Sequence, residues 1–310
     1  MENQTIKIGL PRGLLYYRYR VLWRAFFEKL GMETVTSPPT DREILERGSA
    51  LAIDEACLSL KVYLGHVAAL VGKCDYILVP RVSNFGRHRA MCTRFESTPD
   101  LVRNVFRGQR QKFLSYDVDV EGKDQDLEAA FLELGRSLDC PPRLVKRAWR
   151  LANKVDQAQH KARVQKHEQL YKREGMKVLI AAHSYVAEDP NMGKPVMDYL
   201  KNVGVIPVRA DLVDRETALK RSRELSPTCK WELSREILGG IAMHRGDVDG
   251  IILLSAFPCG PDAMVNEIIT RRVKGIPMLN LVLDSQSGTA GVETRLESFI
   301  DIIRFKEGAL

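Results

Sequence analysis

Short apolar runs alternate with longer amphipathic stretches along most of the chain. The runs at residues 6–11, 33–37, 73–80, 112–116, 176–182, 205–208, 250–254 and 277–283 have the length of buried strands. Helical spacing follows in most gaps, including residues 14–30, 50–69, 194–202, 263–273 and 292–305, and Thr40 and Glu43 have the spacing of a capping box. This alternation predicts an α/β protein with parallel sheets and right-handed crossovers.

A polar, charged segment separates two such series. Residues 121–174 combine an amphipathic stretch, a break at Cys140-Pro-Pro142 and a long helical pattern from about residue 144 to residue 173. The predicted organisation is a first α/β domain at 1–120, a helical bridge at 121–174 and a second α/β domain at 175–310. Charged positions in the bridge indicate a solvated helix face rather than a nucleic-acid site.

Composition excludes several classes of protein. With 310 residues and 45% hydrophobic content the chain is long enough for two globular domains. No run approaches the roughly 18 apolar residues of a membrane span, and the first residues lack the apolar core of a signal peptide, so we expect a cytoplasmic protein without membrane contact. The net charge of +7 is interleaved with 40 acidic residues, which favours an acidic partner or an anionic substrate over nucleic acid.

Six cysteines, at positions 57, 74, 92, 140, 229 and 259, supply the candidate chemistry. Their wide spacing favours thiols or metal ligands over disulfides, and the absence of a CxxC pair argues against a zinc finger. Cys259 follows the predicted strand at 250–254, in a turn fixed by Pro258, Gly260 and Pro261, at the sheet edge where α/β proteins place ligands. A small residue packed in a turn is the alternative.

Cys57 and Cys92 are the second and third candidate ligands. Together with Cys259 they follow three different elements, which suits a site in the cleft between two α/β domains. Thiolates favour soft metals: zinc would usually recruit a fourth Cys or His, whereas an iron-sulfur cluster accepts cysteine ligands and can leave one iron open. Spacing alone does not choose between them, and a cysteine nucleophile at Cys259 with His183 as its base is a further alternative.

Several phrases along nearly the whole chain resemble one family. They are Ile8-Gly-Leu-Pro-Arg-Gly-Leu14, Val35-Thr-Ser-Pro-Pro39, Asp54-Glu-Ala-Cys57 with Lys61, Cys74-Asp-Tyr76, Val79-Pro-Arg81, Cys92 with Phe95 and Pro99-Asp100, Pro258-Cys-Gly-Pro-Asp262, and the stretch 288–299. This set resembles the 2-hydroxyacyl-CoA dehydratase D-component and activase-related family. It is similar to the cluster-bearing domains of 2-hydroxyglutaryl-CoA dehydratase and benzoyl-CoA reductase, and more closely to the activase-related proteins.

The resemblance implies Rossmann-like domains around a 4Fe-4S cluster in the interdomain cleft. It implies Cys57, Cys92 and Cys259 as the ligands, although the family usually has proline where this chain has Ser59 and Thr93. It also suggests a polar role over the cluster for the phrase that contains His183 and Tyr185; two side chains packed at a domain seam are the alternative.

The other three cysteines, Cys74, Cys140 and Cys229, bring the total to six, the number that a related group uses to hold a double-cubane cluster. A double-cubane cluster with six cysteines is less favoured, because Cys74 opens a strand and Cys140 lies in the bridge, whereas Cys229 is a candidate spare ligand or redox thiol.

The functions implied are low-potential electron transfer or dehydratase- or reductase-type chemistry on an acyl-CoA-like substrate, in anaerobic metabolism. Because the chain has no GxxxxGK[ST] loop, the resemblance implies a separate ATP-dependent activase or another electron donor. The alternatives are a non-catalytic carrier, assembly or activase-associated accessory protein, and a cysteine-dependent transferase. A homodimer is compatible with the sequence.

Overall fold

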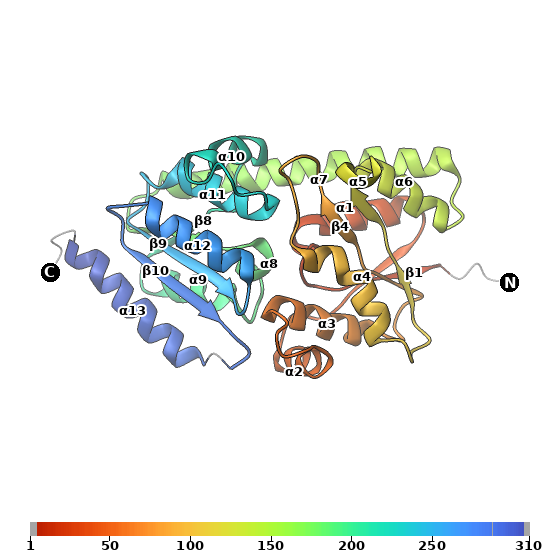
Figure 1. The fold of residues 1–310 in the computed structure, drawn as a ribbon, viewed down its shortest axis with the longest axis horizontal. Coiled ribbons are helices and arrows are strands. Elements are labelled where there is room, and N and C mark those ends of the chain that lie inside the picture. The colour runs from red at the N-terminus through yellow and green to blue at the C-terminus, as the bar shows by residue number, and fades with distance from the viewer. Residues whose placement is uncertain (1–4, 287, 307–310) are drawn as a thin grey trace. The chain divides into compact units, whose positions relative to one another are not determined.

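The computed structural model describes residues 5–286 and 288–306. The chain divides into two compact units, Met1–His160 and Lys161–Leu310, called here the first and the second unit, and the division falls inside the long helix α7 (Pro142–Tyr171). Figure 1 shows the order of the elements along the chain. In the part of the chain that the structure describes, no helix is both long enough and apolar enough to cross a membrane.

The first unit is built on a four-stranded parallel sheet in the order β2-β1-β3-β5. Its strands are β1 (Lys7–Leu10), β2 (Glu33–Thr36), β3 (Tyr76–Leu78) and β5 (Lys112–Leu114). The helices are α1 (Tyr16–Lys29), α2 (Arg42–Leu51), α3 (Leu58–Leu70), α4 (Thr93–Val105), α5 (Val120–Lys123) and α6 (Leu127–Ser137).

A two-stranded parallel sheet, β4 (Arg81–Asn84) with β6 (Asp117–Asp119), continues the first sheet beyond its ends. The run at 73–80 was expected to form one strand, but it is interrupted at Pro80, which has no N–H for the ladder. Backbone pairing resumes at once, because the Arg81 N–H donates to the Tyr116 carbonyl at 2.8 Å. The interruption therefore divides the pairing into two sheets, with β3 beside β5 in the first and β4 beside β6 in the second.

The core of the first unit joins α1 to the segment predicted as a bridge. The Phe131 ring of α6 lies 4.8 Å from the Phe26 ring of α1 and 4.9 Å from the Trp149 ring of α7, measured between centroids. All three side chains are at most 4% exposed. Phe131 of α6 therefore packs against both α1 and α7, and the apolar faces of α6 and α7 belong to the core of the first unit.

The second unit repeats the architecture with a parallel sheet in the order β10-β9-β7-β8. Its strands are β7 (Lys177–Ala181), β8 (Ile206–Arg209), β9 (Gly250–Ala256) and β10 (Met278–Leu283). The helices are α8 (Ser184–Ala187), α9 (Gly193–Asn202), α10 (Arg215–Arg221), the 3-10 turn η1 (Ser222–Glu224), α11 (Glu232–His244), α12 (Gly260–Arg272) and α13 (Thr289–Lys306). Every residue of β9 is buried. The predicted α/β class with two parallel-sheet domains is confirmed.

Three local predictions were wrong. The expected helix at 50–69 is two helices, α2 and α3, separated by a connector that ends at Cys57. The helix start near residue 40 is capped by Asp41, whose carboxylate accepts from the Ile44 N–H at 2.9 Å, rather than by Thr40. The helix after Cys259 begins at Gly260 instead of residue 263.

Candidate functional site

Cys57, Cys92 and Cys259 each occupy the position directly before a helix. Cys57 precedes α3, Cys92 precedes α4 and Cys259 precedes α12, and the backbone is extended at all three, with φ of −63°, −64° and −76°. None of the three side chains makes a capping hydrogen bond to its helix. The backbone amides and the dipole at a helix N-terminus favour negative charge close to them, so a ligand group that carries negative charge suits these positions.

Aspartate occupies the equivalent position at four other helices. Asp41, Asp119, Asp126 and Asp214 precede α2, α5, α6 and α10, and each carboxylate accepts a hydrogen bond from a backbone N–H in the first turn. Aspartate is among the best N-cap residues, whereas cysteine is not. The three cysteines therefore do not perform the capping role that aspartate performs elsewhere in this chain.

Two glycines bring α2 and α3 into backbone contact and so place Cys57. A Cβ on Gly48 or Gly65 would lie 1.8 Å or 2.0 Å from a carbonyl oxygen of the facing helix, so no larger residue fits. The Lys61 ammonium donates to the Asp54 carbonyl at 3.1 Å, which closes the connector ahead of Cys57. The position of Cys57 thus depends on the packing of the helix pair.

A tight reversal after β4 leads to Cys92. Gly86 and His88 have φ of 108° and 61°, and Ala90 then forms an antiparallel bridge with Asn84. Glycine accepts such a backbone conformation without strain, and histidine accepts it more readily than most residues. The chain therefore returns alongside β4 before it enters α4.

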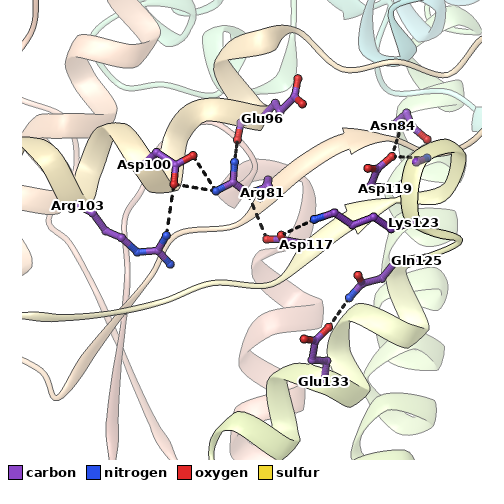
Figure 2. A network of polar contacts seen from close by, with 11 residues as sticks. Arg81, Asn84, Glu96, Asp100, Arg103, Asp117, Asp119, Lys123, Gln125 and Glu133 are labelled. Atoms are coloured by element: carbon purple, nitrogen blue, oxygen red, sulfur yellow. Dashed lines mark hydrogen bonds and ion pairs between the residues drawn. The ribbon is translucent and has the colours of Figure 1, made fainter.

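Arg81 joins the small sheet to α4 (Figure 2). Its guanidinium donates to both carboxylate oxygens of Asp100 at 2.9 Å and to the Glu96 carbonyl at 2.7 Å, and its Nε lies 3.4 Å from Asp117 Oδ1. The Lys123 ammonium contacts the other oxygen of Asp117 at 3.4 Å. One arginine thus connects β4, β6 and α4.

The position of Arg81 is significant because α4 contains Pro99. A proline inside a helix removes one backbone hydrogen bond and weakens the helix at that point. Arg81 contacts a residue on each side of Pro99, Glu96 and Asp100, and so links the first turns of α4 to the rest. We interpret Arg81 as a positioning residue for Cys92, which directly precedes this helix.

His66 of α3 anchors the loops that follow β1 and β2. The imidazole is fully buried, with Nδ1 3.0 Å from Ser37 Oγ and Nε2 3.0 Å from Thr40 Oγ1. Ser37 Oγ already accepts the Arg12 N–H at 2.9 Å, so we assign the Ser37 hydroxyl as the donor to Nδ1 of His66. The Nε2–H of His66 then donates to Thr40 Oγ1. Burial, reinforced by the Arg12 charge, lowers the pKa of His66 to about 3, so the ring is neutral.

Cys259 follows the fully buried β9 in the second unit. Its N–H donates to the Ala256 carbonyl at 2.9 Å, and Pro261 lies in the first turn of α12. Phe257 and Met264, on either side of it in the sequence, are 56% and 59% exposed. The cysteine is therefore flanked in the sequence by two exposed apolar side chains.

His183 and Asp262 form a buried pair beside this turn. His183 follows β7 and precedes α8, and its Nε2 lies 2.8 Å from Oδ1 of Asp262 in the first turn of α12. Burial acts to lower the pKa of His183, but the charge and hydrogen bond of Asp262 raise it, and the net shift is upward. Tyr185 stacks on the His183 ring at 5.1 Å between centroids. The pair thus ties the end of β7 to the helix that Cys259 precedes.

The other three cysteines are in a different environment. Burial raises the pKa of Cys74 to about 11 and also raises the pKa of Cys140 and of Cys229. Cys74 packs against Gly9 of β1, and Cys229 packs against the apolar core of the second unit. These settings favour protonated thiols, and the role of Cys229 as an extra ligand stays a prediction.

Among the residues that the structure describes, neither unit by itself holds a complete metal site. Within each unit, no three His, Cys, Asp or Glu side chains among the described residues are grouped so that they could bind a metal ion. Cys57 and Cys92 belong to the first unit and Cys259 to the second. A three-cysteine centre would take ligands from both units, and the predicted ligand set stays a prediction.

No local sequence pattern assigns a role to Arg81, Asp100 or Asp262, and none singles out His66. The first three occur in the phrases Val79-Pro-Arg81, Pro99-Asp100 and Pro258-Cys-Gly-Pro-Asp262, so the resemblance contained a signal for them. His66 lies within an apolar helical stretch, and no local feature of that stretch indicates its two hydroxyl partners.

Comparisons with known proteins identify one family. A family profile described as the CoA enzyme activase uncharacterised domain (DUF2229) matches residues 7–213, a span that includes Cys57, Cys92 and His183 and ends before Cys259. Among curated proteins, none matches the chain.

The structural matches include two structures of the SBP FpvC from Pseudomonas aeruginosa. The complex with Ni²⁺ has 11% identity and a TM-score of 0.29, over 99% of this chain and 98% of that one. The complex with Mn²⁺ has 12% identity and the same TM-score of 0.29, over 99% and 100% of the two chains.

Proposed function

The chain belongs to the family described as the CoA enzyme activase uncharacterised domain. We propose that it is an iron-sulfur protein that works with an ATP-dependent CoA enzyme activase. The proposed cofactor is a 4Fe-4S cluster held by Cys57, Cys92 and Cys259. When bound, such a cluster supplies transfer of single electrons at low potential. The proposal concerns a protein that accepts electrons from an ATP-dependent activase and passes them on.

The observation that supports this most directly is the helix-start position shared by the three cysteines. Each side chain stands at a helix N-terminus without capping it, while four helices of the same chain use aspartate caps. The amides and dipoles of three helices would offset the negative charge of thiolate ligands. Cys74, Cys140 and Cys229, by contrast, have raised pKa values that disfavour a thiolate.

The surrounding residues support a preorganised donor set. Arg81 fixes α4 behind Cys92, and the His183–Asp262 pair fixes α12 behind Cys259. Ligands that are held by packed helices and hydrogen-bonded neighbours need less reordering when a cofactor binds. His183 and Tyr185 are proposed to assist cluster binding in two ways. They help to hold α12 in place, and His183 carries a positive charge that Asp262 favours.

An electron-transfer role requires a partner. The sequence has no GxxxxGK[ST] loop, and the proposed electron donor is a separate ATP-dependent activase. Exposed apolar side chains occur near two of the cysteines in the sequence: Ile53 before Cys57 is 60% exposed, and Phe257 and Met264 flank Cys259. Chemistry on an acyl-CoA-like substrate is the finer form of the proposal, and an accessory carrier of the cluster is its alternative.

Anaerobic iron and sulfide analysis tests the ligand assignment. The wild type is expected to contain about four iron and four sulfide per chain, with absorbance near 400 nm. Cys57→Ala, Cys92→Ala and Cys259→Ala are each expected to lose most of this iron, whereas the matched controls Cys74→Ala and Cys140→Ala retain it.

Two outcomes would contradict the proposal. Loss of iron in Cys140→Ala with retention in Cys92→Ala would overturn the ligand set. A wild type that is iron-free after anaerobic purification, but alkylated selectively at Cys259, would favour the cysteine-dependent transferase with His183 as its base.

A further inference from the structure

Helix α7 exposes an apolar row on its surface. Its buried face, which includes Val145 and Trp149, packs into the first unit. Beside that face, Leu144, Leu151 and Val155 are 37%, 39% and 49% exposed. Their separations of seven and four residues place them on one side of the helix.

A basic row runs parallel to the apolar one. Arg143, Arg147, Arg150 and Lys154 are all exposed, and their separations of four, three and four residues align them along α7. At 3.6 residues per turn this row lies about 90° around the helix from the apolar row. The stretch 143–155 contains no Asp or Glu, and none of the four basic side chains makes an ion pair with the described residues.

We propose that these two rows, together called the α7 surface, bind an acidic amphipathic helix of a partner protein. Over residues 143–155 the surface is about 18 Å long, or more than three helical turns. Because the apolar row lies between the buried face and the basic row, a helix placed along it would also align its flanking carboxylates with the arginines. Apolar rows with flanking charges are a recurring way to select a partner helix and fix its orientation.

The charges of the α7 surface argue against the other occupants. A second copy of this chain would bring two basic rows together, and such like-charge contacts oppose association. A membrane-binding helix usually adds Trp or Phe to its exposed apolar face, whereas this row contains only Leu and Val. A nucleic-acid backbone would match the basic row but not the apolar one. The inference does not depend on the iron-sulfur cluster.

Two synthetic helical peptides test the proposal on the full chain. Both have the same Leu and Ala apolar row, flanked in one peptide by Glu and in the other by Lys. By fluorescence anisotropy at low salt, the Glu peptide is expected to bind at least tenfold more tightly than the Lys peptide, and its affinity is expected to fall as salt is raised.

Variants of the α7 surface locate the binding. The double substitution Leu151→Asp with Val155→Asp is expected to weaken binding of the Glu peptide at least tenfold, as is Arg147→Glu with Lys154→Glu. The matched control is Lys29→Glu with Lys220→Glu, which makes the same change in net charge at exposed positions outside α7 and is expected to leave specific binding within about threefold. Circular dichroism establishes that each variant is folded.

Several results would overturn the proposal. Equal affinity for the two peptides, or binding that the Leu151→Asp and Val155→Asp pair leaves unchanged, would contradict it. Self-association in sedimentation that this pair abolishes would assign the surface to a second copy. The protein could instead bind phosphatidylserine vesicles or duplex DNA but not the Glu peptide. If Arg147→Glu with Lys154→Glu removed that binding, the α7 surface would be assigned to an anionic lipid surface or nucleic acid.

Discussion

In each unit an ion pair holds a helix that a cysteine directly precedes, α4 in the first unit and α12 in the second, and the two pairs differ mainly in burial. In the second unit, His183 and Asp262 are 5% and 9% exposed and join β7 to α12. In the first unit, Arg81 and Asp100 are 21% and 63% exposed and join β4 to α4. Removing one partner of a buried pair leaves a polar group without solvent, whereas an exposed pair is replaced by water. The buried His183–Asp262 pair should therefore contribute much more to the free energy of unfolding than the exposed Arg81–Asp100 pair.

Two buried histidines show that burial alone does not determine charge. His66 in the first unit has hydroxyl partners and the Arg12 guanidinium nearby, and its pKa is lowered to about 3. His183 in the second unit also loses solvent, but the Asp262 carboxylate more than offsets this, and its pKa is raised. The partner group decides whether the buried ring is neutral or charged.

The largest predicted effect comes from breaking the buried pair. Asp262→Ala leaves His183 buried without its carboxylate, and we expect the free energy of unfolding to fall by about 4 kcal/mol. Urea unfolding, together with hydrogen exchange of peptides from α12 and β7, measures the loss and locates it in the second unit. Asp262→Asn, which keeps a hydrogen-bond acceptor, is the control and should lose less than half as much. An unchanged unfolding midpoint in Asp262→Ala would refute a supporting role for the pair.

The order of elements was predictable, but the positions of the cysteines were not. Buried strands such as β9 are continuous apolar runs with polar boundaries, so local pattern is sufficient to find them. The pattern at 50–69 predicts a helix that includes Cys57, because the break between α2 and α3 depends on backbone contact at Gly48 and Gly65, which is tertiary packing. Cysteine is also not a usual helix cap, so no local rule marked its position.

The supporting contacts were beyond local pattern for a related reason. His183 and Asp262 come from different elements of the second unit, and Arg81 and Asp100 from different elements of the first. Only the sheet topology brings each pair together, and no periodicity specifies it. The phrases that resembled the activase-related family contained Arg81, Asp100 and Asp262, yet their role became evident only from their contacts.

Acid should weaken the first unit through His66. Its pKa is about 3 when folded and near 6.5 when unfolded, so below pH 6.5 the unfolded chain binds a proton that the folded chain does not. The free energy of unfolding should fall with a slope that approaches about 1.4 kcal/mol per pH unit below pH 6.5, which amounts to about 2.3 kcal/mol between pH 6.5 and 4.5. Arg12 and Asp41 are the charged groups that act on this ring, and Arg12 adds to the shift. His183 acts in the opposite sense, because its stabilisation is present at low pH and lost as pH rises through its raised pKa.

His66→Gln isolates this contribution. The variant lacks the titrating ring but keeps groups that can bond to Ser37 and Thr40, so the difference between its unfolding curves and those of the wild type reports His66 alone. The two free energies should converge as pH is lowered from 6.5 to 4.5. Parallel curves over that range would contradict a neutral, buried His66.

The smallest predicted effect is at Arg81. Arg81→Met removes the contacts to Asp100 and to the Glu96 carbonyl, and we expect a loss of about 1 to 2 kcal/mol, because the arginine is only partly exposed while Asp100 is mostly exposed. Hydrogen exchange of peptides from α4 should increase mainly in its first turns, before Pro99. Added salt should reduce the difference from the wild type, which it should not do for Asp262→Ala.

Arg103→Met is the matched control for Arg81→Met. The Arg103 guanidinium also contacts Asp100, at 3.5 Å, but the side chain is 51% exposed, and in the described part of the chain no hydrogen bond joins this guanidinium to a carbonyl of α4. Its loss should cost less than about 0.5 kcal/mol. If both substitutions had the same effect, the carboxylate of Asp100 alone would account for it. The interpretation of Arg81 as a link across Pro99 would then fail, because that interpretation requires the bond to the Glu96 carbonyl.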